Sequence, residues 1–515
     1  MTALTPDVKV LVIGAGAMGS GIAHVAAAAG HSVYLYDTRA EAVEKGRDGI
    51  ARDLRFLVSK SKLAEADAEA TLTRVIPVTD LAAARDAGLA IEAIVENLDI
   101  KQKLFKELED LLGPDAILAT NTSSLSITQI GAALDRPERL AGLHFFNPAP
   151  RMKLVEIVSG LATTRAIADT LYATAKAWGK VPVHATSTPG FIVNRVARPY
   201  YAEALRVLNE RAADPATLDA ALREGCGFPM GPFELMDLIG HDVNFAVTKS
   251  VFDAYFGDKR FTPSLIQQEL VAAGRLGRKS GRGFYDYAEG ALPASPQSES
   301  PQQGETSVTV VGDLGPATPL IARLEAAGVA IRRLPGEDEA TGRARGWIEI
   351  GAARLALADG RTASLRAHDE GFANLVLLDL ALDYATTPRL TLARGDACSE
   401  GAWNAVVGIL QRTGASIARL DDIAGLVGLR TVAMLANEAA DGVLQGIGTA
   451  TDIDTAMRYG TNYPKGPLAW ADELGVGFVA QVLENLGTHY GEERYRLSPL
   501  LQRIALRPEG RFHAM

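Results

Sequence analysis

Two side chains, twelve residues apart, have the types that a proton-transfer site needs. His144 ends an apolar run, Asn147 and Pro148 turn the chain, and Glu156 closes the next run. Where two such segments lie adjacent, the carboxylate holds the imidazole in one tautomer and stabilises its charged form. The imidazole can then take a proton near neutral pH. On this stretch alone, the alternative is a structural histidine hydrogen-bonded to a loop acid.

A glycine-rich turn near the N-terminus has the form of a dinucleotide-binding fingerprint. Gly14, Gly16 and Gly19 follow a predicted buried strand and open an alanine-rich helix, and Asp37 closes the next predicted strand. The first glycine permits the tight turn, the second lets the backbone approach a pyrophosphate, and the third lets helix and strand pack closely. Asp37 suits an adenosine ribose and repels a 2′-phosphate, which favours NAD over NADP, although Arg39 could serve such a phosphate. A glycine-rich turn without a ligand is the alternative.

These residues require a doubly wound sheet that brings strand ends together. Its strands are predicted from apolar runs at residues 8–13, 31–37, 75–80 and 89–94, within 117–127, and in the run that ends at His144. Ligands bind at the carboxyl ends of strands in such sheets, where Glu96 and Ser123 follow two of these runs. Residues 41–74 predict one long charged helical stretch, whose Lys60 and Lys62 could meet phosphates or face solvent.

Five motifs, in order and spacing, make the first part of the chain resemble a known family. They are GAGAMGSGIA, IEAIVENLDIKQKLF, NTSSLSI, GLHFFNPAPRMKLVEIV and TPGFIVNR. Together they resemble the 3-hydroxyacyl-CoA dehydrogenases, in a match that runs nearly unbroken from about Val8 to Tyr287. The resemblance implies NAD-dependent oxidation of an L-3-hydroxyacyl-CoA to the 3-oxoacyl-CoA. It also implies an α/β fold, with a Rossmann-type doubly wound sheet followed by an all-α domain.

The resemblance also implies individual roles. His144 would take the proton of the C3 hydroxyl, Glu156 would stabilise the imidazolium, and Ser123 and Asn194 would hydrogen-bond substrate oxygens. The residues implied for the NAD site are Gly14, Gly16, Met18, Gly19, Asp37, Glu96, Lys101 and Asn121. No metal is implied.

An internal repeat determines the rest of the predicted architecture. Adding 235 to the residue numbers aligns a second copy of the helical segment without gaps. Glycines, prolines and the helical pattern recur, whereas the polar groups are replaced: Asn194 by Leu429, Glu156 by Thr391, and His144 at or near Asp379. The second strand–glycine–helix unit has Gly312 and Gly315 but no third fingerprint glycine and no closing acid. We therefore expect a degenerate copy whose Rossmann-like unit binds no cofactor.

The predicted organisation has five parts. They are an NAD-binding Rossmann domain (1–186), a helical substrate domain (187–288), a proline-, serine- and glutamine-rich linker (289–306), a degenerate Rossmann-like domain (307–420) and a second, structural helical domain (421–515). A helical domain with a wide apolar face must cover it, and short members of the family do so by dimerising. We expect the second copy to dock on the first as an internal pseudo-dimer, with a homodimer of whole chains as the other possibility.

Composition narrows the classes of partner. The chain has 515 residues, 47% of them hydrophobic, and a net charge of -10, which argues against nucleic acid as a partner. No apolar run is long enough to predict a membrane span. The two cysteines fit neither a disulfide framework nor a metal site. A cytoplasmic protein is therefore expected, and the family resemblance implies an acyl-CoA substrate.

A fused two-copy chain without a crotonase-like domain resembles the enzymes of phenylacetate catabolism. The resemblance implies 3-hydroxyadipyl-CoA as substrate, with 3-hydroxybutyryl-CoA next. A basic partner for the distal carboxylate cannot be identified from the sequence. A dehydrogenase of free 3-hydroxyacids and a non-catalytic, crystallin-like NAD-binding protein are the rival classes. The presence of His144 and Glu156 argues against both.

Overall fold

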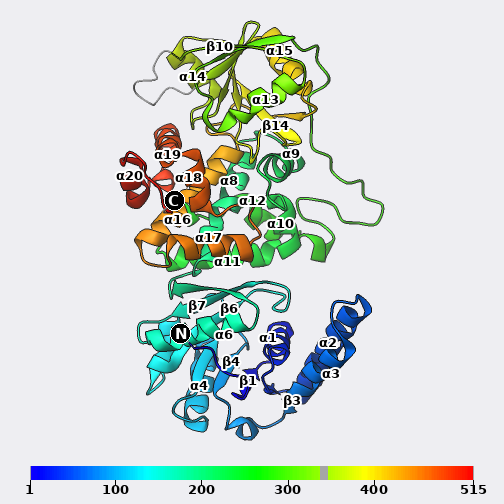
Figure 1. The fold of residues 1–515 in the computed structure, drawn as a ribbon, viewed down its shortest axis with the longest axis vertical. Helices are drawn as coiled ribbons and strands as arrows, with labels where there is room; N and C mark the ends of the chain where they lie inside the picture. The colour runs from blue at the N-terminus through cyan, green and yellow to red at the C-terminus, as the bar shows by residue number, and fades with distance from the viewer. Residues whose placement is uncertain (1, 337–345, 514–515) are drawn as a thin grey trace. The chain divides into compact units, whose positions relative to one another are not determined.

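The structure is a computed structural model that describes residues 2–336 and 346–513 (Figure 1). The chain divides into two compact units. The first comprises residues 1–195 with 445–461, and the second comprises residues 196–444 with 462–515. In the described residues, no helix is both long and apolar enough to cross a membrane.

An eight-stranded sheet forms the core of the first unit. Its strands are β1 (Val10–Ile13), β2 (Val33–Tyr36), β3 (Val75–Val78), β4 (Leu89–Glu92), β5 (Ile117–Thr120), β6 (Leu140–Phe145), β7 (Leu154–Ser159) and β8 (Val181–Thr186). They are ordered β3-β2-β1-β4-β5-β6-β7-β8, and only the β6–β7 pairing is antiparallel. The central strands are buried apolar runs because helices cover both faces of such a sheet. The predicted doubly wound sheet is therefore confirmed.

Helices of the first unit connect these strands. They are α1 (Ala17–Ala28), α2 (Ala40–Ser59), α3 (Glu65–Arg74), α4 (Leu98–Leu111), α5 (Ile127–Gly131), α6 (Arg165–Ala177), the short α7 (Val193–Val196) at the edge of the unit, and α17 (Ala450–Gly460). The helical stretch predicted over 41–74 is two helices, α2 and α3, which run side by side (Figure 1). The chain turns between them at Ser61, whose φ of 53° is incompatible with a continuing helix.

One helix of this unit comes from the second copy. Helix α17 packs on β7 and β8. The N–H of Thr186 donates to the carbonyl of Ile447 at 2.9 Å, and Gly460 lies against Leu154 so closely that a Cβ there would be 2.6 Å from its Cδ2. Residues 445–461 thus belong structurally to the first sheet, although the sequence groups them with the second helical domain.

The second unit holds most of the helices of the two helical copies. The first copy contributes α8 (Arg198–Asn209), α9 (Pro215–Ala220), a π-helical turn at Ala221–Gly225, α10 (Pro232–Ile239), α11 (His241–Ala254) and α12 (Leu265–Ala272). The second contributes α16 (Gly428–Leu444), α18 (Pro467–Leu474), α19 (Val476–Tyr490) and α20 (Pro499–Ala505). Helix α8 packs along α16.

Buried ion pairs join the two helical copies within this unit. Arg430 of the second copy lies 2.7 Å from Glu203 of the first, and both side chains are buried. A second pair runs in the opposite sense, from Arg260 of the first copy to Glu438 of the second at 3.1 Å. Guanidinium and carboxylate groups are removed from water here only because each finds its partner.

A seven-stranded sheet completes the second unit. Its strands are β9 (Ser307–Val311), β10 (Ala330–Leu334), β11 (Trp347–Ile350), β12 (Ala353–Leu357), β13 (Leu375–Leu378), β14 (Arg389–Arg394) and β15 (Ser416–Arg419), in the order β10-β9-β11-β12-β13-β14-β15. Its helices are α13 (Pro319–Ala326), α14 (Ala363–Glu370) and α15 (Glu400–Gln411). The offset of 235 extends into this sheet, because β14 begins and ends 235 residues after β7. The predicted second Rossmann-like region is confirmed.

Candidate active site

The two residues that suggested proton transfer are hydrogen-bonded. His144 on β6 and Glu156 on β7 are direct cross-strand partners, and His144 Nδ1 lies 2.6 Å from Glu156 Oε2. His144 is 5% exposed and Glu156 is fully buried. When Glu156 is ionised, Nδ1 carries the proton that this bond needs, which leaves Nε2 as the acceptor nitrogen.

The other oxygen of Glu156 fixes the start of a helix. Glu156 Oε1 accepts hydrogen bonds from the N–H groups of Ile192 and Val193, each at 3.0 Å, where α7 begins. These are N–H groups that a helix terminus leaves without intrahelical partners. The half-buried Asn194 follows directly, so Glu156 positions both the imidazole and the helix that carries Asn194.

Aromatic rings flank the imidazole. The rings of Phe146 and Phe191 have centroids 4.5 Å and 5.8 Å from that of His144. Phe191 has a φ of 47°, a conformation that costs energy for a bulky residue and that the surrounding contacts must hold. Apolar walls of this kind strengthen the hydrogen bond between His144 and Glu156 by excluding water.

Ser123 lies in the loop after β5, at the carboxyl end of the strand next to β6. Its backbone N–H donates to Glu96 Oε1 at 3.1 Å, and the residue is exposed. The hydroxyls of Thr122 and Ser124 donate to the same oxygen at 2.5 Å and 2.8 Å. Burial acts to raise the pKa of Glu96, but these hydrogen bonds and the charge of Lys101 outweigh it and lower the pKa below its usual value.

Lys101 is buried in an ion pair that the sequence analysis missed. Its Nζ lies 2.5 Å from Glu92 and 3.2 Å from Glu96, and Thr120 donates its hydroxyl to Glu92 at 2.6 Å. Glu92 is fully buried at the end of β4. The sequence does contain a signal for this pair, because the otherwise apolar strand Leu-Ala-Ile-Glu ends in a carboxylate. A buried carboxylate needs a buried partner.

The glycine turn has the shape that a dinucleotide needs. Gly14 has a φ of 99°, and a Cβ there would lie 2.5 Å from the carbonyl oxygen of Ala93. A Cβ on Gly19 would lie 1.7 Å from the carbonyl oxygen of Gly14, whereas one on Gly16 would meet no atom within 4 Å. The turn therefore leaves open space beside the N-terminus of α1, where backbone N–H groups and the helix dipole favour a pyrophosphate.

Three further residues implied for the cofactor site line or support this edge. Asp37 accepts hydrogen bonds from the N–H groups of Ala15 at 2.9 Å and Arg39 at 3.0 Å, which ties the glycine turn to the end of β2. Asn121 Oδ1 accepts from the N–H of Phe145 at 2.8 Å and so fixes the end of β6 beside His144. Met18 is half-buried in the first turn of α1.

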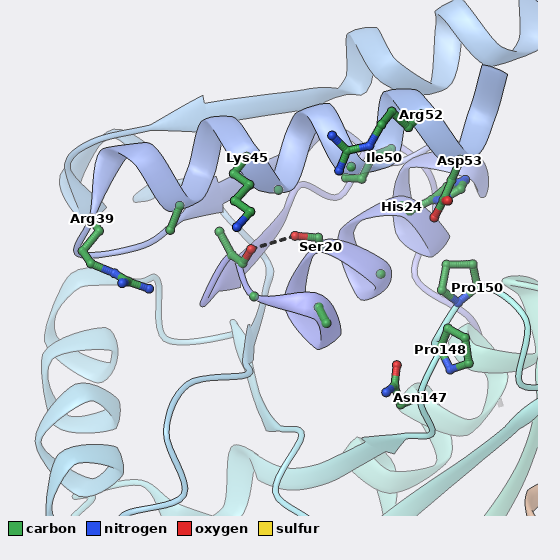
Figure 2. A pocket seen from close by; sticks show the side chains of 17 residues that line it. Ser20, His24, Arg39, Lys45, Ile50, Arg52, Asp53, Asn147, Pro148 and Pro150 are labelled. Carbon is green, nitrogen blue, oxygen red and sulfur yellow. Dashed lines mark hydrogen bonds between the residues drawn. The ribbon is translucent and has the colours of Figure 1, made fainter. Parts of the chain in front are cut away.

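A cavity of about 560 Å³ lies between α1, α2 and the loop that follows β6. Figure 2 shows its labelled lining side chains: Arg39, Lys45, Ile50, Arg52 and Asp53 of α2 or its start, Ser20 and His24 of α1, and Asn147, Pro148 and Pro150 of the loop. Lys60 and Lys62, which the sequence analysis considered for phosphates, are exposed and do not line it.

A buried lysine holds the loop wall of this cavity. Lys180 Nζ donates to the carbonyl oxygens of Ala149 at 2.5 Å and Met152 at 2.9 Å. Burial lowers the pKa of Lys180 to about 8. The ammonium thus clamps the loop that carries Asn147 and Pro148.

Models of three family domains cover most of the chain. The 3-hydroxyacyl-CoA dehydrogenase NAD binding domain matches residues 9–188, and the C-terminal domain of the same family matches residues 190–287 and again 425–511. The 3-hydroxybutyryl-CoA dehydrogenase reduced Rossmann-fold domain matches residues 355–423.

Named relatives agree with these matches. The chain is 47% identical to the 3-hydroxyadipyl-CoA dehydrogenase of Escherichia coli (strain K12) over 97% of its own length and 98% of the relative's. It is 42% identical to the probable 3-hydroxybutyryl-CoA dehydrogenase of Bacillus subtilis, which spans 55% of this chain. A crystal structure of 3-hydroxybutyryl-CoA dehydrogenase from Escherichia coli K12 superposes with a TM-score of 0.87 at 45% identity, covering 98% of this chain and 99% of the other.

Proposed function

The chain belongs to the 3-hydroxyacyl-CoA dehydrogenase family and binds NAD, and from this premise we propose that His144 carries out its proton transfer. The supporting observation is the buried hydrogen bond of 2.6 Å between His144 and Glu156. In the oxidation of an L-3-hydroxyacyl-CoA, Nε2 of His144 accepts the proton of the C3 hydroxyl. NAD, when bound, supplies the carbon that accepts the hydride from C3.

Glu156 stabilises the imidazolium that results. Its second oxygen is held by the N–H groups of Ile192 and Val193, so the carboxylate cannot turn away from the ring. Ser123 and Asn194 donate hydrogen bonds to substrate oxygens, which orients the reacting carbon. Both lie next to segments that Glu156 or Glu96 holds in place.

In the cofactor site, Gly14, Gly16 and Gly19 admit the pyrophosphate to the N-terminus of α1, Met18 lies in the same helical turn, and Asp37 accepts from the adenosine ribose. Glu96 and Asn121 lie at the nicotinamide end. Lys101 acts through its carboxylate partners, because its ammonium is already paired with Glu92 and Glu96. We expect Lys101→Met to raise the KM for NADH, in parallel with loosening of the loop that carries Ser123.

The cavity along α2 takes the phosphate-bearing part of CoA. Its cations Arg39, Lys45 and Arg52 lie on one wall, and CoA carries several phosphate charges that such a wall attracts. Arg52→Ala should raise the KM for CoA thioesters several-fold with little change for NADH. Lys62→Ala, which removes an exposed cation outside the cavity, is the matched control. Equal effects of the two changes would contradict this placement.

The substrate is 3-hydroxyadipyl-CoA, with 3-hydroxybutyryl-CoA next, in phenylacetate catabolism in the cytoplasm. The similarity to the Escherichia coli 3-hydroxyadipyl-CoA dehydrogenase over nearly the whole two-copy chain supports this choice of substrate. The test is oxidation of NADH by the full-length protein with 3-oxoadipyl-CoA and with acetoacetyl-CoA. A higher kcat/KM for 3-oxoadipyl-CoA is the expected result, and turnover of neither compound would contradict the function.

The five-part division predicted from the sequence describes an internal pseudo-dimer, in which the second copy takes the place of a partner subunit. Its support is the pair of oppositely directed ion pairs, Arg430 to Glu203 and Arg260 to Glu438. A fragment ending near Tyr287 should therefore aggregate or dimerise. A monomeric, stable and fully active fragment would contradict this role.

A further inference from the structure

A second cavity, of about 260 Å³, lies in the helical part of the second unit. It is bounded by α8, by the turn at Lys259–Phe261 and by the start of α12. Four arginines line it: Arg198, Arg206, Arg260 and Arg494. The cavity reaches the surface at Leu265, which is largely exposed.

Three of the four guanidinium groups are neutralised by carboxylates. The pairs are Arg206 with Glu492 at 2.9 Å, Arg260 with Glu438 at 3.1 Å and Arg494 with Glu203 at 3.5 Å. Arg198 differs, because it forms no ion pair with any carboxylate that the structure describes. The positive charge of the cavity is therefore concentrated at Arg198.

Arg198 is buried as well as unpaired. It is 5% exposed, and its only hydrogen bond within the described residues runs from Nη1 to the Thr248 hydroxyl at 3.1 Å. Its guanidinium carbon lies 4.9 Å from the ring centroid of Tyr201, and Nε has no partner. A buried guanidinium with unfilled donors is costly unless something else satisfies it.

The second copy supplies a control for whether the fold needs these groups. The offset of 235 also aligns α11 with α19, and each of these helices begins after a glycine of positive φ. At this offset three polar or aromatic residues of the first copy are replaced in the second: Arg198 by Ala433, Tyr201 by Ala436 and Thr248 by Leu483. All three replacements are fully buried. The same helical scaffold is therefore stable with an apolar interior at this place. The polar set occurs only in the copy that also keeps Asn194.

The chemistry of the cavity indicates its ligand. An unpaired guanidinium presents a planar fork that fits a carboxylate with two parallel hydrogen bonds. Leu205, Phe261 and Pro263 add apolar walls that suit an alkyl chain. The volume lies below the roughly 300–1,000 Å³ of sites for drug-sized ligands, so a short chain fits and a nucleotide does not. We infer that this cavity binds the carboxylate end of a short aliphatic acid, with Arg198 as its main ligand.

Two sources can supply such a carboxylate. One is the distal end of a dicarboxylyl-CoA substrate, in which case the inference rests on the proposed function. Arg198 follows Asn194 by four residues in the sequence. The other source is a free aliphatic acid that binds on its own.

The experiment compares Arg198→Met, which keeps the length of the side chain and removes the charge, with Arg198→Lys and with the control Arg206→Gln. Arg206 is already bonded to Glu492, so its loss leaves the unpaired cation in place. The first readout is the ratio of kcat/KM for 3-oxoadipyl-CoA to that for acetoacetyl-CoA. The second is the rise in Tm that millimolar adipate produces.

If the distal carboxylate of the substrate binds here, Arg198→Met lowers the ratio at least about 30-fold, Arg198→Lys lowers it less, and Arg206→Gln changes it less than about threefold. If a free acid binds, the ratio is the same in the wild type and in the variants, and adipate raises the Tm of the wild type but not of Arg198→Met. A constant ratio together with no adipate effect on the wild type overturns the inference. Wild-type protein that reduces neither thioester refutes the proposed function instead, and the adipate measurement still decides the carboxylate site.

Discussion

In both copies a carboxylate joins the sheet to the helix that follows, but different residues supply it. In the first sheet, His144 and Glu156 face each other across β6 and β7. At the offset of 235, the second sheet has Asp379 directly after β13 and Thr391 on β14, and the N–H of Asp379 donates to the carbonyl of Thr391. In the second copy the carboxylate therefore stands at the position equivalent to His144, and no imidazole among the residues that the structure describes lies beside it.

The helix cap is retained while the proton-transfer group is lost. Asp379 accepts hydrogen bonds from the N–H groups of Val427, Gly428 and Leu429 at 3.2, 2.7 and 2.9 Å, where α16 begins. Glu156 does the same for α7 through Ile192 and Val193. A buried carboxylate that joins sheet to helix is therefore common to both copies. The histidine beside it, like Asn194, occurs only in the copy to which we assign chemistry.

Replacing Glu156 should produce the largest effect, because it has both roles. Glu156→Gln keeps an oxygen for the two N–H groups but loses the charge, so kcat should fall about 100-fold or more. Glu156→Ala should also lower the free energy of unfolding by about 1–3 kcal/mol for each N–H left unsatisfied. Steady-state kinetics and denaturant unfolding check the two parts. Equal stability of the two variants would show that the cap contributes nothing.

Breaking the pairing between the helical copies should come next. Arg430→Met leaves the buried Glu203 with the hydroxyl of Tyr495 at 2.9 Å and the more distant guanidinium of Arg494 at 3.5 Å. Removal of one partner from a buried pair typically costs about 3–5 kcal/mol. Chemical denaturation should show this loss in the transition of the second unit. The control is Arg361→Gln, which removes a more exposed, paired arginine from the loop between β12 and α14. A similar loss of stability in both variants would contradict a special role for the pair of Arg430 with Glu203.

The pH dependence of stability should report on Asp379. Burial raises the pKa of Asp379 to about 6, and hydrogen bonds from Gly428, Leu429 and their neighbours only partly oppose this. Because the pKa is higher folded than unfolded, protonation stabilises the native state as pH falls. Relative to Asp379→Asn, the wild type should therefore lose roughly 2 kcal/mol of stability as pH rises from 4 to 7. A stability difference between the wild type and Asp379→Asn that stays constant from pH 4 to pH 7 would contradict this prediction.

Features that depend on local sequence could be predicted. The family resemblance, the doubly wound sheet and the second copy are confirmed, because glycine spacing, apolar strands and a constant offset are local or repetitive signals. His144 and Glu156 were predicted to meet if their two segments lie adjacent, and the antiparallel pairing of β6 with β7 makes them adjacent. Their catalytic role stays a prediction.

Features that depend on packing between elements could not be predicted from the sequence. Lys101 on α4 pairs with Glu92 at the end of β4, and the sequence marks Glu92 only as an acid that ends an apolar run. The isolation of Arg198 follows from which carboxylates its neighbours in space have already taken, and no spacing encodes that. Residues 445–461 likewise pack in the first unit, although their place in the sequence groups them with the second helical domain.

Single-turnover oxidation of NADH by His144→Gln tests the central claim most directly, with Asp379→Asn as the control at the equivalent position of the second copy. With acetoacetyl-CoA saturating, His144→Gln should transfer hydride about 10³- to 10⁴-fold more slowly than the wild type while binding NADH equally well. Asp379→Asn should transfer it at the wild-type rate. Hydride transfer by His144→Gln within tenfold of the wild type would contradict the claim that this imidazole moves the proton.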